Sequence, residues 1–543
     1  MSALDEIRGG AAPASLARGP VLAGVLALAR AESVRLLRHP AVLGGFAAYL
    51  LSWGHALLGG DGANRYPVLQ DSSRLVQIPL LLPAAGVLLG ANSGALRSRR
   101  HGVEPVFAVE GLSLRARTAA HLLAVGPAVV LSALLVCARL GRLAAEPDAV
   151  GTVQWAEGAT GPAVVLLAGI LGVLTARLTP SPAAASLLLA LLAVFTLLAA
   201  VRNTARWRWL GVIAHENESA QPLPSELLDR PAGAHLLWPT ALAAAGACGA
   251  LLCGRADSVP EGPHRGTRAL WAAAAAAAVL ALLGGALQTR PASDAVRRAR
   301  AAAVEHPAAQ QKCEKRRNVT YCAFPEFTGR VEQWDGVVRG VLARLPDDVG
   351  KASYAVRQRI FRSGVETGGS VPLPSAAWEA DDRRAGTPAA VPVGTAWSAG
   401  SAGQDVESDA VAEFSVLFAY RAVTGSVPNA PRVNSVCGSR AVLTLWLAGQ
   451  ATGGSGAALR DMESRSTGGL TVLVLMSATG VDFDTAEVRL ARDLLAQPAD
   501  RIAAGVRAAW AELSAPDTTT ARAARLLGVR APVRDAADES ACR

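Results

Sequence analysis

Seven apolar stretches dominate the first 287 residues of the chain, and they restrict its possible folds more than any other feature. Each approaches the roughly 20 residues that an α-helix needs to cross the hydrocarbon core of a bilayer. The hydrophobic share of the whole sequence, 51%, is also unusual for a fully soluble protein. We therefore predict a polytopic α-helical membrane protein with six to seven transmembrane helices, at residues 41–59, 75–95, 118–138, 161–176, 183–201, 235–253 and 269–287.

The loop between the second and third predicted spans is strongly basic. It reads RSRRHGVEPVFAVEGLSLRAR (97–117) and also contains two acids and a histidine. Short loops rich in arginine stay on the cytoplasmic side, so this loop and the N-terminus are predicted to be cytoplasmic. Seven crossings then place residues 288–543 outside the cell, whereas an even number would reverse that. The charged residues of the loop are Arg97, Arg99, Arg100, His101, Glu104, Glu110, Arg115 and Arg117.

Residues 1–40 lack the continuous apolar core of a cleavable signal peptide. Between residues 22 and 38, leucines and valines alternate with Arg30, Glu32, Arg35 and Arg38. This mixture predicts an amphipathic helix that lies along the cytoplasmic membrane interface. The alternative is a simple basic flank that orients the first span.

Residues 288–543 are predicted to form a soluble, mixed α/β domain. Apolar spacing favours helices over residues 294–304, 331–345, 406–423, 440–451, 485–495 and 500–513, and strands over residues 354–361 and 470–476. The stretch 364–403 is rich in Gly, Ser, Pro and Ala, which indicates a long connection.

The cysteines provide a separate test of the topology. Cys313 and Cys322 bracket the segment KCEKRRNVTYC, whose alternating ends suit a hairpin closed by a disulfide. Disulfides persist in oxidising compartments, so this pairing agrees with an extracytoplasmic domain. A zinc site is the alternative, although the two cysteines are too far apart for the usual close pair and no histidine follows His306. Three further cysteines lie in or at the ends of predicted spans. By elimination, the two remaining cysteines of the soluble part, Cys437 and Cys542, form a second pair.

Several classes of chemistry are disfavoured by the residues. The body of the C-terminal domain contains no histidine, which argues against a His-dependent hydrolase or a metal centre there. The only Gly-Lys pair, Gly350-Lys351, is followed by Ala352, so the chain lacks a phosphate loop. The net charge of +9 lies mostly in the membrane half, where orientation explains it better than nucleic-acid binding does. We expect no enzyme activity and no cofactor in this chain.

Two segments of the N-terminal half carry a family resemblance. ARAESVRLLRHPAVLGG (29–45) leads into the first span, and RSRRHGVEPVFAVEGLSLRARTAAHLLA (97–124) contains the basic loop. With these segments, residues 1–287 resemble permease subunits of type-2 ATP-binding-cassette exporters, particularly the actinobacterial kind. The C-terminal domain, with CEKRRNVTYC, looks similar to domains attached to some such permeases, including relatives fused to aminopeptidase-like modules.

The resemblance implies a function and partners. The first segment would be an interfacial connector helix, and the second would meet a separate ATPase subunit that hydrolyses ATP. The basic loop would then have a docking role, unless its arginines only set the topology. We expect a multi-pass protein of the cell membrane, in contact with lipid and paired with a second copy or a similar permease. The alternative is a membrane-anchored sensor or immunity protein with an extracytoplasmic ligand-binding domain.

Overall fold

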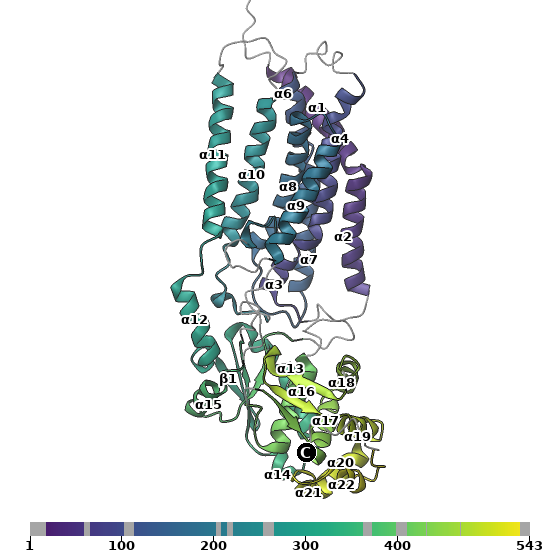
Figure 1. Ribbon diagram of the computed structural model, residues 1–543. Helices are drawn as coiled ribbons and strands as arrows, with labels where there is room; N and C mark the ends of the chain where they lie inside the picture. Colours follow the sequence, from purple (N-terminus) through teal and green to yellow (C-terminus); the bar gives the residue numbers. More distant parts are fainter. Residues whose placement is uncertain are drawn as a thin grey trace, which may run out of the picture.

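A computed structural model describes residues 18–58, 66–102, 113–201, 208–213, 221–253, 265–361, 372–397, 410–429, 432–466 and 468–532. The chain is mostly helical and has two parts (Figure 1). Long helices from the first half lie side by side in a bundle, and the C-terminal region packs at one end of it (Figure 1). Helix α4 ends, and helix α6 begins, at the opposite end of the bundle (Figure 1).

Helices occupy every stretch predicted to span the membrane. Among the described residues, five helical segments are long and apolar enough to cross a bilayer: Leu69–Arg100, Leu114–Ala144, Trp155–Leu178, Ala232–Cys253 and Gly266–Gln288. The remaining two predicted spans coincide with α2 and α9. The bundle comprises α1 (Arg18–Leu37), α2 (Pro40–Leu58), α3 (Leu69–Leu75), α4 (Leu81–Arg100), α6 (Leu114–Leu123), α7 (Gly126–Ala144), α8 (Trp155–Leu178), α9 (Ala183–Val201), α10 (Ala232–Cys253) and α11 (Arg265–Gln288).

Small residues bring α2, α4 and α8 close together. A Cβ at Gly172 of α8 would lie 2.3 Å from the Leu88 carbonyl oxygen of α4, and one at Gly86 would lie 2.2 Å from the Ala41 carbonyl oxygen of α2. Asn92 of α4 donates from Nδ2 to the Gly172 carbonyl, 3.2 Å away. Close backbone approach through small residues is typical of helices packed in membranes. The outward faces of α2, α7, α9 and α11 expose many leucines and valines.

Helix α1 packs along α6 through a stripe of one residue per turn. Val25, Ala29, Glu32 and Leu36 are buried, and Val25 and Ala29 cluster with Ala120 of α6. The spacing of three to four residues places this stripe on one helix face. Leucines on other faces of α1 stay exposed, so the helix has apolar surface beyond its packing face.

The first sheet of the C-terminal region has the order β1-β2-β3-β4. Its strands are β1 (Lys312–Arg316), β2 (Val319–Ala323), β3 (Tyr354–Gln358) and β4 (Val391–Val393). β1 and β2 form an antiparallel hairpin, and the next two pairs are parallel. Cys313 is directly opposite Cys322 in the hairpin, and the predicted disulfide joins them.

A second sheet has the order β5-β7-β6 and lies among the helices that follow. Its strands are β5 (Val433–Val436), β6 (Leu470–Leu473) and β7 (Gly480–Phe483). One large apolar core, which includes Trp334, Phe418 and Trp446, joins both sheets to these helices. The helices are α12 (Asp294–Glu305), α13 (Val331–Leu342), α14 (Asp347–Gly350), α15 (Ser375–Arg384), α16 (Ala410–Thr424), α17 (Gly438–Gly449), α18 (Ser455–Ser464), α19 (Thr485–Leu495), α20 (Ala499–Ala508), α21 (Trp510–Leu513) and α22 (Thr520–Leu526).

The prediction of a plain connection over 364–403 is wrong in its described part. Helix α15 and strand β4 lie within it. Trp378 is buried and donates from Nε1 to the Val304 carbonyl, 2.5 Å away. Asp382 near the end of α15 binds Arg357 of β3 and Arg359, which directly follows this strand. These contacts are distant in sequence and stabilise a segment whose composition resembles a loop.

Candidate functional site

The basic end of the bundle contains the charged residues that the sequence singled out. Arg97, Arg99 and Arg100 lie in the last turn of α4, where the partial negative charge of a helix C-terminus favours cations. Arg115 and Arg117 lie at the start of α6, whose first turn is capped by the Ser113 hydroxyl. Glu104 and Glu110 lie outside the described residues. We define the basic end as Arg30, Glu32, Arg35, Arg38, Arg97, Arg99, Arg100, His101, Arg115 and Arg117.

Glu32 connects the predicted interfacial helix to the predicted coupling segment. Its carboxylate accepts hydrogen bonds from Arg35 Nη1 at 2.6 Å and from Arg97 Nη1 at 3.1 Å. The Glu32 side chain is 8% exposed, whereas those of Arg35 and Arg97 are 58% and 41% exposed. One buried acid therefore positions two arginines that still reach solvent. All three residues were candidates from the sequence, but the ion pair between Glu32 and Arg97 was not predicted.

Other groups at the basic end are arranged around this contact. Arg115 of α6 donates from Nη2 to the Thr267 hydroxyl of α11, 3.3 Å away. Arg30, Arg38 and Arg100 are exposed, as is His101. Guanidinium groups present several donors in a planar fork that matches carboxylate and phosphate oxygens. The basic end is thus suited to bind an acidic protein surface or phosphate groups.

His39, between α1 and α2, does not add to this positive charge at neutral pH. Burial lowers its pKa, and the neighbouring Arg97 lowers it further. The Ala41 backbone N–H points at His39 Nδ1, 3.3 Å away, which requires that nitrogen to be unprotonated. The positive potential of this end therefore comes from its arginines.

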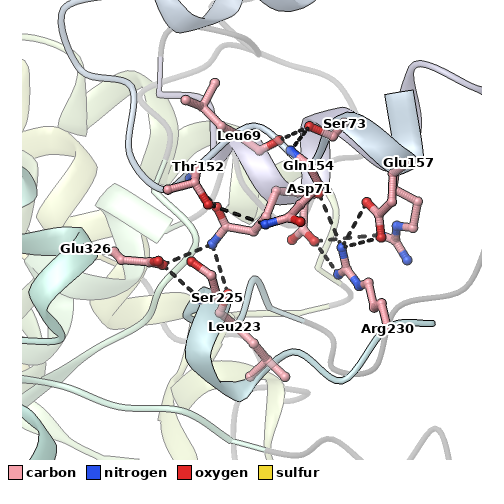
Figure 2. Close-up of polar contacts among 12 residues, drawn as sticks. Leu69, Asp71, Ser73, Thr152, Gln154, Glu157, Leu223, Ser225, Arg230 and Glu326 are labelled. Atoms are coloured by element: carbon pink, nitrogen blue, oxygen red, sulfur yellow. Dashed lines mark hydrogen bonds and ion pairs between the residues drawn. The ribbon is translucent and has the colours of Figure 1, made fainter. Parts of the chain in front are cut away.

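A second polar cluster joins the bundle to the C-terminal region, and the sequence analysis missed it (Figure 2). Arg230, before α10, donates from Nη2 to Asp71 Oδ1 at 2.6 Å, and its Nη1 lies 3.5 Å from the Glu157 carboxylate of α8. The same Nη1 donates to the Gln70 carbonyl at 3.2 Å. The side chains of Arg230 and Glu157 are 6% and 4% exposed. We use the name junction for this cluster together with the contacts that Gln70 and Glu326 make with Thr152, Leu223 and Ser225.

Gln70 of α3 extends the junction to the C-terminal region. Its Nε2 donates to the Leu223 carbonyl at 2.9 Å and to Glu326 Oε2 at 3.4 Å, and its Oε1 accepts from the Thr152 N–H at 3.3 Å. The Ser225 N–H also donates to Glu326 Oε2, at 2.9 Å. Helix α3, two loops of the bundle and the segment after β2 are therefore linked through the buried Gln70 amide (Figure 2).

Further contacts next to the junction lock the two parts together. Arg330 donates from Nη2 to the Tyr66 carbonyl at 2.6 Å, and its guanidinium lies 5.0 Å from the centre of the Tyr66 ring. Gln333 of α13 donates to Asp148, which follows α7. Burial is the main cause that raises the pKa of Glu326. The junction and these contacts connect the C-terminal region to α3 and to the loops around α8.

The cysteines of the C-terminal region agree with an oxidising environment. Cys313 and Cys322 are disulfide-bonded, and Cys437 is also in a disulfide. Cys542, the partner expected from elimination, lies outside the described residues. Across the parts of the chain that the structure describes, no group of three or more His, Cys, Asp or Glu residues is placed to hold a metal ion.

Comparisons with protein families, with characterised proteins and with solved structures found no match to this chain. The two ends of the bundle and the apolar helices between them are therefore the features that bear on function.

Proposed function

We propose that the chain is the membrane-spanning permease subunit of an ATP-binding-cassette exporter, itself without catalysis and driven by a separate ATPase. The main support for this proposal is the buried Glu32 of α1. Its carboxylate binds Arg97 at the end of α4 and so joins these two helices. An ATPase that bound the exposed arginines there would act on α1 and α4 together. Helix α4 continues through the bundle to α3 and the junction, so a movement at the basic end has a mechanical route to the other side.

The same proposal assigns the topology. Seven helices, α2, α4, α6 with α7, α8, α9, α10 and α11, alternate in direction between the two ends of the bundle (Figure 1). With the basic end in the cytoplasm by the positive-inside rule, the C-terminal region lies outside the cell. The Cys313–Cys322 disulfide supports this side, because such bonds persist in oxidising compartments. The exposed leucines of α1 would rest on the cytoplasmic face of the membrane.

The test is co-purification of the intact protein with an ATP-binding subunit from native membranes. Wild type is compared with a triple variant, Arg97→Ala, Arg99→Ala and Arg100→Ala. The matched control is Arg297→Ala with Arg298→Ala, which removes exposed charge from α12 at the other end of the molecule. Protease accessibility of residues 288–543 checks that every variant inserts in the same orientation.

The proposal expects that a subunit with a phosphate-loop motif co-purifies with wild type and the control, and is lost from the triple variant. If no ATPase accompanies wild type under conditions that preserve membrane complexes, the exporter assignment fails. The sensor or immunity protein would then be the better assignment, and binding assays on the extracytoplasmic region would follow.

A further inference from the structure

The bundle contains an apolar cavity beneath α9. It has a volume of about 420 Å³ and lies between α4, α8 and α9, with Val212 and Ile213 also in its wall. This volume falls within the range of about 300–1,000 Å³ that ligand pockets usually occupy. The cavity spans the first half of α4 and the second half of α9, which places it in the half of the bundle nearer the C-terminal region.

The lining leaves little choice of ligand chemistry. It contains no charged side chain, and its one hydroxyl, that of Thr196, already donates to the Leu192 carbonyl at 2.8 Å. Apolar cavities without polar partners do not hold ordered water. The lining is therefore suited to a hydrocarbon ligand.

The cavity also opens toward the outside of the bundle. Leu82 of α4 and Leu197 of α9 line it and are nevertheless 49% and 63% exposed. The outer face of α9 continues this apolar surface through Leu187, Leu191 and Val194. The interior of the cavity is thus continuous with a surface that the proposed membrane placement would immerse in lipid chains.

Helix α9 is suited to admit a ligand because it is loosely held. Ala185 is its only buried residue among those whose side chains the structure describes. Helix α8, in contrast, packs closely on α4 through Gly172 and carries the buried cavity residues Val164, Leu167 and Ala168. The cavity therefore has one rigid wall, formed by α4 and α8, and one displaceable wall, formed by α9.

We propose that this cavity binds an acyl chain of a membrane phospholipid, which enters sideways past Leu82 and Leu197 from the leaflet nearer the C-terminal region. The site rests on the membrane placement within the proposed function and not on the ATPase. A bound chain would fill the space between α9 and the α4–α8 pair and would couple lipid occupancy to the position of α9.

The experiment uses the full chain in lipid nanodiscs that contain a phosphatidylcholine with a diazirine in one acyl chain. After irradiation, mass spectrometry maps the adducts. Bulk lipid reaches exposed residues such as Leu282 of α11, but it does not reach the buried Val164, Leu167 and Ala168 of α8. Adducts on these α8 residues therefore report a chain inside the cavity.

Two variants of α9 form a matched pair. Ala193→Phe adds a ring at a residue that lines the cavity, whereas Ala190→Phe adds the same ring three residues away, outside the lining. Both alanines are exposed, so both substitutions are expected to fold. The proposal expects the α8 adducts to be lost in Ala193→Phe and kept in Ala190→Phe, with Leu282 labelled in both.

Several labelling results would overturn the site. In the first, adducts appear on Leu282 and on α9 but not on α8. In the second, the α8 adducts persist equally in both variants. In the third, a water-soluble carbene reagent labels the α8 wall, which would mean a hydrated cavity. In the fourth, both α9 and α8 stay unlabelled, which would mean that a protein surface such as a second copy covers this face. If Leu282 itself is unlabelled, the membrane placement fails and this site fails with it, whereas loss of ATPase co-purification leaves the site intact.

Discussion

Ion pairs of arginine with carboxylates occur at both ends of the helical bundle, but the two ends balance these charges in opposite ways. At the basic end, one buried carboxylate, Glu32, serves two arginines that reach solvent. At the junction, the almost fully buried Arg230 is shared by two carboxylates, Asp71 and Glu157. The arginines of the basic end therefore keep positive charge that a partner can reach. At the junction, the charge of Arg230 is neutralised by carboxylates of the same chain.

This difference separates a surface for binding from a structural connection. Exposed ion pairs contribute about 0–1 kcal/mol, because water and salt screen them. A buried pair contributes little net stability, yet removing one of its partners is costly, since a charge remains buried without compensation. The junction should therefore be sensitive to single substitutions that the basic end tolerates.

The largest expected effect is that of Arg230→Ala. The substitution removes this cation from the buried Glu157 and the largely buried Asp71, while Arg74 still lies 4.0 Å from Asp71, and it should lower the free energy of unfolding by about 3 kcal/mol. Denaturant unfolding in nanodiscs, followed by tryptophan fluorescence, would measure it. Arg142→Ala of α7 is the control, because the ion pair of Arg142 with Glu146, just after this helix, is exposed and should contribute about 0–1 kcal/mol. Equal losses in the two variants would refute a distinct role for the junction.

Gly151→Ala should have the next largest effect. Gly151 has φ +81°, a conformation that costs an L-residue about 1–2 kcal/mol, and its new Cβ would lie 1.8 Å from Gln70 Oε1. Since Gln70 is held by Leu223 and Thr152, we expect a total loss of about 2–3 kcal/mol. Gly336→Ala in α13 is the control, because its Cβ would meet no atom within 4 Å and should stabilise the helix by about 0.5–1 kcal/mol. A neutral Gly151→Ala would show that Gln70 is free to move.

The sequence predicted the helices well because their signal is local. Runs of apolar residues of bilayer length locate α2, α8, α9, α10 and α11 directly. The Cys313–Cys322 pair was also predictable, since its hairpin is contained in one short segment. The arginines of the basic end were visible for the same reason, being concentrated in one loop.

The junction could not be predicted in this way. Arg230 and Asp71 are 159 residues apart, and Gln70 and Glu326 are 256 apart. Each lies in a segment that is merely polar, and one sequence gives no sign of which polar residues will be buried together. Glu32 was visible as a charge, but its burial against Arg97 depends on how α1 packs. Strands β5 and β7 were not predicted for the same reason. Both are short, and they are stabilised by pairing with each other across a long sequence separation.

Glu32→Ala tests the other side of the comparison and should have a smaller effect on stability. Arg35 and Arg97 lose an acceptor, but both can be solvated, so we expect a loss of about 1 kcal/mol. Co-purification of the proposed ATPase subunit should decrease more than stability does, because Arg97 would no longer be held by Glu32. A loss as large as that of Arg230→Ala would mean that the basic end is a structural core as well.

The smallest effect concerns pH and Glu326 at the junction. Burial raises the pKa of Glu326 above the ordinary value of 4.5, so from about that pH upward the folded state holds this proton more tightly than the unfolded state does. Stability from this group is present at low pH and is lost as pH rises through the folded pKa. Glu326→Gln, which keeps an acceptor for Ser225, should therefore become more stable relative to wild type as pH increases through this window. A Glu326→Gln difference of the opposite sign would mean that the hydrogen bonds from Ser225 and Gln70 outweigh burial in setting the pKa of Glu326.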